Sequence, residues 1–210
     1  MTKVVPAVEE KDAAAFRQRV AQVRQLTDRI QMDVVDGEFA DIKTVFPNEV
    51  VPPSGLKLDI HLMVARPMEF ISNCIKLRPY TIIVQYESGD SVEAAIERIA
   101  DNGIRAGLAI NPDTPVAEIA SLLGRVSHVL VMAYPAGMPG GKLQPKVFSK
   151  LAELRELKDS LEISLDGGVN SETAKKIAKA GFDIVYTNTY LFSGESLLTR
   201  YHELIEAFSS

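Results

Sequence analysis

The chain has 210 residues, of which 46% are hydrophobic and 24% are charged, with a formal net charge of −5. This length and composition predict a single domain over residues 1–210 with a proper core, and they exclude a disordered chain. The absence of a Lys/Arg block argues against nucleic acid as the main partner, because phosphate neutralisation needs a basic face. No apolar run approaches the length of a membrane span, so no membrane partner is expected.

Cys74 is the only cysteine, which excludes an intrachain disulfide and a thiolate zinc cluster and agrees with a reducing compartment. The first residues, MTKVVPAVEEKD, lack the apolar core of a signal peptide. We therefore expect a cytoplasmic protein.

Eight short apolar runs, rich in β-branched residues, alternate with amphipathic stretches at a spacing of roughly 25 residues, which is typical of βα units. The runs are KVVPAV (3–8), RIQMDVV (29–35), LKLDIHLMV (56–64), YTIIVQY (80–86), IRAGLAI (104–110), SHVLVMA (127–133), LEISLD (161–166) and FDIVYTN (182–188). The predicted helices are 13–26, 67–77, 91–102, 115–124, 145–158, 171–181 and 195–208. Ser171, Gly103 and Gly181 stand where helix capping would place them.

Eight strands and seven helices predict a closed (β/α)8 TIM barrel, because parallel strands covered on both faces read as nearly continuous apolar runs. The second unit is irregular, since Pro52 and Pro53 forbid a normal long helix between 36 and 55. We expect a long loop there with at most one helical turn. A doubly wound open sheet is the alternative, although its glycine fingerprint is missing.

Four polar residues stand near predicted strand ends, where a parallel barrel places its active site. They are Gln31 and Asp33 on the second strand, His61 on the third and Asp166 at the end of the seventh. Gln31 and Asp33 are two residues apart and therefore share one face of their strand. The alternative is that each aspartate caps a turn and that His61 is a structural core histidine.

Glycine-rich loops follow the sixth and seventh predicted strands, and small hydroxyl and amide side chains follow the eighth. Together they predict a phosphate site in which backbone N–H groups hold the anion. The residues are Gly137, Gly140, Gly141, Gly167 and Gly168, followed by Asn188 and Thr189 after the eighth strand. The alternative is that these glycines only form tight turns. Met63 and Met132, also at strand ends, could line a planar intermediate or simply pack in the core.

The segments MDVVDGEF, DIHLMV, GLAINPDTP, VLVMAYPAGMPGGK and SLDGGVN occur in this order. From the second predicted strand to the helix that follows the seventh strand, this pattern resembles the ribulose-phosphate 3-epimerase family. The resemblance implies a barrel that inverts C3 of a phosphorylated ketose, such as ribulose 5-phosphate or xylulose 5-phosphate, through an enediolate. Asp33 and Asp166 match the family's two acid/base groups. The resemblance also implies a homo-oligomer and a divalent metal, Zn, Fe, Mn or Mg, on His61, Asp33 and Asp166.

Several positions depart from the family pattern. Gln31 replaces a metal-binding histidine, and a neutral amide oxygen is a poorer ligand than imidazole for zinc or iron but tolerates harder ions. Metal-free operation therefore stays open. The other departures are Ala7, Val35, Gln85 and the pair Asn188–Thr189.

Three functions follow from these patterns. The first is an isomerase that acts on a phosphorylated ketose, with Asp33 and Asp166 as the acid/base pair. The second is a non-catalytic relative that binds a sugar phosphate or a protein partner. The third is a barrel decarboxylase or aldolase, which would need an inward lysine beside a strand-end aspartate, and no such lysine is evident.

Overall fold

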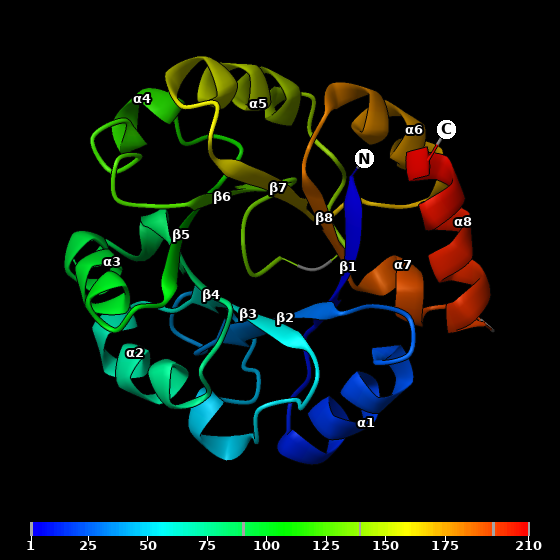
Figure 1. Cartoon of the computed structure of the whole chain (residues 1–210), viewed down its shortest axis with the longest axis horizontal. Helices are drawn as coiled ribbons and strands as arrows, with labels where there is room; N and C mark the ends of the chain where they lie inside the picture. The colour runs from blue at the N-terminus through cyan, green and yellow to red at the C-terminus, as the bar shows by residue number, and fades with distance from the viewer. Residues whose placement is uncertain (1, 90, 139, 195, 210) are drawn as a thin grey trace.

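The computed structural model describes residues 2–89, 91–138, 140–194 and 196–209 and confirms the TIM barrel. Eight parallel strands close in sequence order, and the helices surround them (Figure 1). The strands are β1 (Lys3–Val8), β2 (Arg29–Val35), β3 (Lys57–Met63), β4 (Thr81–Gln85), β5 (Arg105–Ile110), β6 (His128–Met132), β7 (Glu162–Asp166) and β8 (Ile184–Thr187). Each lies within a predicted run.

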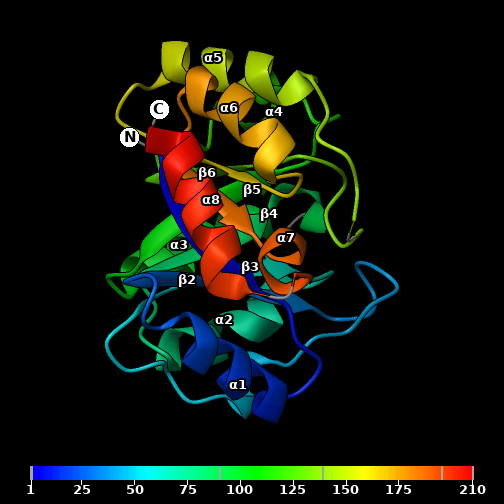
Figure 2. The ribbon, with the colours of Figure 1, turned by 90° about the vertical axis from the view of Figure 1, so that its right-hand side faces the viewer.

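The outer helices mostly match the predicted amphipathic stretches. They are α1 (Ala13–Val23), α2 (Pro67–Lys76), α3 (Val92–Asp101), α4 (Val116–Ile119), α5 (Lys146–Leu157), α6 (Ser171–Ala180), α7 (Thr189–Phe192) and α8 (Leu197–Ser209). Helix α8 packs against β1 and α6, which brings the two ends of the chain to the same side of the barrel (Figure 2). Residue 195, the predicted start of the last helix, lies outside the described residues.

The irregular second unit is confirmed, because residues 36–55 form a loop whose only described helical element is the 3-10 turn η1 (Pro47–Glu49). Two other predictions were wrong in detail. The helix expected over 115–124 ends at Ile119 and continues as turns. Residues 189–192, read as loop, form the one-turn helix α7, whose Leu191 is fully buried in the core.

Side-chain alternation along the strands separates two apolar clusters. Val4, Val8 and Ile30 belong to the layer between strands and helices, whereas Val5 and Ala7 belong to a smaller cluster with residues of other strands inside the barrel. Because the pleat has a period of two, every second residue of each strand points inward. The inward positions of β2 are therefore the odd-numbered ones, which include Gln31 and Asp33.

A buried ionic cluster fills the end of the barrel where the strands begin. Arg29, 3% exposed, donates to Asp59 at 2.6 Å and to Glu162 at 2.8 Å. Tyr186 also donates its hydroxyl to Asp59, at 2.8 Å. Since β2 and β7 are not neighbours, the Arg29 guanidinium joins strands across the barrel interior. Close packing and charge pairing at this end are typical of the stabilising face of a TIM barrel.

Within the described residues, no helix combines the length and the apolar character that crossing a bilayer requires.

Candidate active site

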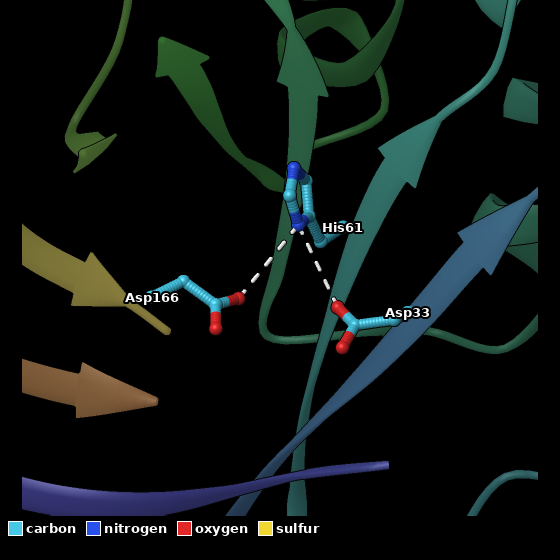
Figure 3. A group of neighbouring side chains, drawn as sticks. All are labelled: Asp33, His61 and Asp166. Atoms are coloured by element: carbon cyan, nitrogen blue, oxygen red, sulfur yellow. Dashed lines mark ion pairs between the residues drawn. The ribbon is translucent and has the colours of Figure 1, made fainter. Parts of the chain in front are cut away.

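The structure brings Asp33, His61 and Asp166 together near the strand ends (Figure 3). Asp33 and His61 are register partners on β2 and β3, and Asp166 reaches the same point from β7. The His61 Nδ1 atom lies 3.5 Å from Asp33 Oδ1 and 3.9 Å from Asp166 Oδ2. The three side chains thus converge on one point from three strands.

Gln31 lies directly beside this group and is fully buried. Its amide Nε2 donates to Asp33 Oδ1 at 2.8 Å and to Asp166 Oδ2 at 2.6 Å. The amide therefore bridges two carboxyl groups that come from non-adjacent strands. Its Oε1 has no hydrogen-bond partner among the described residues, and neither does His61 Nδ1. Such buried unpaired polar atoms cost free energy unless a ligand or ion satisfies them.

The electrostatics of the two aspartates reflect their burial. Burial raises the pKa of Asp33 to about 7, although the hydrogen bond from Gln31 works against this. Burial likewise raises the pKa of Asp166 to about 7, and the neighbouring Asp33 carboxylate adds to the increase. Burial lowers the pKa of His61. Two carboxylates confined beside a neutral imidazole therefore favour a bound cation or a retained proton.

The donor set fits a divalent ion. One oxygen or nitrogen from each of Asp33, His61 and Asp166 lies within 4.8 Å of the others. A rotation of the Gln31 amide would turn its unpaired oxygen toward the same point and supply a fourth donor. Two carboxylates, one carboxamide and one imidazole make a predominantly oxygen site, which suits Mn²⁺ or Mg²⁺ better than a site of two imidazoles does.

A cavity of about 300 Å³ opens above the two aspartates. Met63 and Met132, both nearly buried, form apolar parts of its wall. The loops after β6, β7 and β8 supply most of the remaining wall. All the glycine-loop residues singled out in the sequence line it: Gly137, Gly140, Gly141, Gly167, Gly168, Asn188 and Thr189.

The described residues that line the cavity include three carboxyl side chains and no lysine or arginine. The third carboxyl group is Glu9, which follows β1 and continues its inward series after Val5 and Ala7. Burial raises its pKa to about 7, and repulsion from Asp33 contributes. Sequence reasoning missed Glu9, although the period-two alternation of this strand was a usable signal. An anionic ligand here must be held by backbone N–H groups and neutral side chains.

Tyr134 was also not identified from the sequence. The ring of this residue explains why two positions of the cavity wall are glycine. A Cβ on Gly141 would lie 2.3 Å from the Tyr134 ring, and one on Gly167 would lie 2.6 Å from it. Gly167 also has a φ of +88°, a conformation that residues with a Cβ adopt at a cost. The loops after β6 and β7 therefore close over Tyr134 because they carry no side chains there.

Gly167→Ala is expected to lower the free energy of unfolding by about 2 kcal/mol or more, since the left-handed backbone and the clash with Tyr134 act together. Urea denaturation measures the loss. Gly55→Ala is the matched control, because Gly55 has a φ of +78° but a Cβ added there would meet no described atom within 4 Å. Equal losses in the two variants would show that Tyr134 does not restrict this loop.

Comparison with known proteins decides the family. The model of the ribulose-phosphate 3-epimerase family matches residues 3–192. The chain belongs to this family. It is 31% identical over 201 residues to ribulose-phosphate 3-epimerase of Bacillus subtilis, covering 91% of this chain and 93% of that protein. It is 32% identical over 180 residues to the Chlamydia pneumoniae protein of the same name, covering 81% and 79%.

Membership of the ribulose-phosphate 3-epimerase family makes the protein a sugar-phosphate epimerase and therefore an isomerase. Solved structures support the fold alone. A Streptococcus mutans protein named KGPDC superposes with a TM-score of 0.75 at 12% identity and covers 99% of this chain and 97% of that one. The 3-hexulose-6-phosphate synthase of Salmonella typhimurium gives 0.72 at 14% identity, covering 99% of each chain.

Proposed function

We propose that this protein interconverts ribulose 5-phosphate and xylulose 5-phosphate, or a closely related pair of ketose phosphates, by moving the proton on C3. The observation that carries the proposal is the meeting of Asp33 and Asp166, from strands that are not neighbours, below one cavity. Inversion needs two groups on opposite faces of the carbon, because a single base would return the proton to the face from which it came.

The proposed reaction begins with one aspartate ionised and the other protonated. The ionised carboxylate takes the C3 proton, the electron pair of the C–H bond forms the C2–C3 double bond, and the π pair of the C2 carbonyl moves onto its oxygen, which gives an enediolate. The protonated aspartate then delivers its proton to the opposite face of C3, and the C2 carbonyl forms again. The two aspartates exchange protonation states in each turnover, so the same pair can run the reverse reaction.

The residues of the cavity wall suggest how the substrate would be bound. Backbone N–H groups of Gly141, Gly167 and Gly168, with the side chains of Asn188 and Thr189, would hold the phosphate group. Met63 and Met132 would cover the flat enediolate with apolar, adaptable surface.

His61, Asp33 and Asp166, with Gln31 Oε1 as a fourth donor, would hold a divalent ion in this site. A bound ion of this kind would stabilise negative charge on the enediolate oxygens. The two aspartates would orient it, while the Gln31 amide keeps their carboxyl groups at a fixed separation when no ion is present. Because Gln31 stands where the family has histidine, we propose Mn²⁺ or Mg²⁺ before Zn²⁺ or Fe²⁺.

Deuterium incorporation tests the proposal. The protein is incubated in D₂O with ribulose 5-phosphate, with no added metal and with each of Mn²⁺, Mg²⁺, Zn²⁺ and Fe²⁺ in turn. We expect xylulose 5-phosphate to form and deuterium to appear at C3, followed by ¹H NMR. Thermal stabilisation by the sugar phosphate without any C3 exchange would contradict turnover and favour a binding role, which the altered residues Gln31 and Gln85 would then explain.

A further inference from the structure

A chain of hydrogen bonds leads away from His61 on the side opposite the two aspartates. His61 Nε2 lies 2.8 Å from Gln85 Oε1, and both side chains are fully buried. The Gln85 amide Nε2 donates to Glu87 Oε2. The other oxygen of Glu87 accepts the backbone N–H of Asn111 at 2.9 Å and the hydroxyl of Thr114. Glu87, which is partly buried, therefore ends a series of hydrogen bonds that begins at the imidazole.

Glu87 determines which group donates and which accepts in each of these hydrogen bonds. A carboxylate only accepts hydrogen bonds, so the group of Gln85 that faces it must be the NH₂. The Gln85 oxygen then necessarily faces His61, and an oxygen in that position accepts a hydrogen bond from an Nε2–H group. The imidazole consequently carries its hydrogen on Nε2.

The opposite ring nitrogen is then left with a lone pair. His61 Nδ1 lies 3.5 Å from Asp33 and 3.9 Å from Asp166 and makes no hydrogen bond with the described residues. Had Nδ1 carried a proton, it would be expected to approach a carboxylate more closely, at about 2.7–2.9 Å. The distances around Nδ1 and the order of donors and acceptors from Glu87 to His61 thus lead to the same assignment. His61 Nδ1 is an unprotonated acceptor that points between the two carboxyl groups.

We propose that Glu87 is a positioning residue that acts through Gln85 to hold His61 in the Nε2–H form, so that Nδ1 stays available as a cation ligand. Neither Gln85 nor Glu87 touches the proposed substrate cavity. The part of this inference that concerns cation binding rests on the proposed function, but the assignment of the imidazole proton does not. Hydrogen-bond partners of this kind typically change metal affinity about 10- to 100-fold.

The Glu87→Gln variant tests the proposal with almost no change in shape. The new side-chain amide oxygen at position 87 would continue to accept from Asn111 and Thr114, which would turn the new NH₂ toward Gln85. Gln85 would then reverse, its NH₂ would face His61, and the imidazole proton would move to Nδ1. We expect ¹H–¹⁵N NMR of the metal-free protein to report this change of tautomer. Mn²⁺ affinity, measured by EPR of the free ion, should fall about 10- to 100-fold.

A second variant separates positioning from a structural role. In the double variant Gln85→Glu with Glu87→Gln, the carboxylate moves next to His61 and accepts from Nε2 and from the new amide at position 87. We expect the original tautomer to return and most of the Mn²⁺ affinity with it. Glu97→Gln is the control, since Glu97 is an exposed residue of α3 that pairs with Arg125 on the outer surface. It should change neither measurement.

An unchanged tautomer in Glu87→Gln would overturn the proposal, and so would a double variant that keeps the reversed tautomer. If the wild-type protein showed no C3 exchange, the proposed function would fail, and if it bound no Mn²⁺, only the proposed cation site would fail. The tautomer measurement would still decide this inference in both cases. Unfolding of Glu87→Gln, detected by circular dichroism, would show that Glu87 is structural and would also overturn it.

Discussion

Asp33→Asn and Asp166→Asn are each expected to slow the interconversion of the two ketose phosphates by at least about a hundredfold, because a positioned acid or base contributes about 10²–10⁴ in rate. Asparagine keeps the size of the side chain but neither takes nor delivers the C3 proton. A coupled assay that consumes xylulose 5-phosphate measures kcat and KM. The loss should lie mainly in kcat, since neither aspartate is proposed to hold the phosphate group.

Asp41→Asn is the control for these two variants. Asp41 is exposed in the loop after β2 and lies outside the residues that line the cavity. It should leave kcat unchanged. A folded Asp33→Asn or Asp166→Asn protein with the wild-type rate would contradict the paired mechanism, whatever the metal content.

Arg29→Met is expected to lower the free energy of unfolding by about 3–5 kcal/mol, because it leaves partners of a buried guanidinium without their counter-charge. Asp59 is fully buried and would keep only the Tyr186 hydroxyl as a partner from this group. Urea denaturation at pH 7 measures the change. The effect on the C3 reaction should be small at temperatures where the variant is folded, since Arg29 lies at the other end of β2 from Asp33 and the cavity.

Arg125→Met provides the comparison for Arg29. Arg125 pairs with Glu93 and Glu97, but all three side chains are about half exposed, so the loss should stay below about 1 kcal/mol. Similar losses for the two arginines would contradict the role assigned to the buried cluster.

The ionic cluster around Arg29 also makes the free energy of unfolding depend on pH in the acid range. Burial alone would raise the pKa of Glu162, but hydrogen bonds from His128 and Arg29 outweigh it and hold the pKa well below its usual 4.5. A lowered pKa in the folded state adds stability that is present above pH 4.5 and is lost as the pH falls toward the folded value. We therefore expect the difference in stability between wild type and Arg29→Met to narrow in acid.

The barrel could be predicted from sequence because its signal is repeated. Each strand is an apolar run of similar length, and eight such runs with helical stretches between them leave few alternatives. The shortened α4 and the one-turn α7 were not predictable in the same way. Residues 115–124 have an amphipathic pattern, but only Val116–Ile119 form regular helix and turns follow. The four residues at 189–192 are too few to show a helical period.

Part of the candidate site could likewise be predicted from the sequence, and part could not. Position at strand ends singled out Asp33, His61 and Asp166, and the structure brings all three together. The sequence could not reveal that the Gln31 amide bridges the two aspartates, because contact across a barrel depends on how the strands are staggered. The link from His61 through Gln85 to Glu87 was hidden for the same reason. Sequence spacing shows which residues share a face, but not which faces meet.

The most direct test of two acids acting on opposite faces is to follow loss of the C3 proton in D₂O from each epimer separately, using the two single variants. We predict that Asp33→Asn exchanges the C3 proton of only one epimer and that Asp166→Asn exchanges that of only the other, with no inversion in either. Exchange from both epimers by either variant would contradict the account.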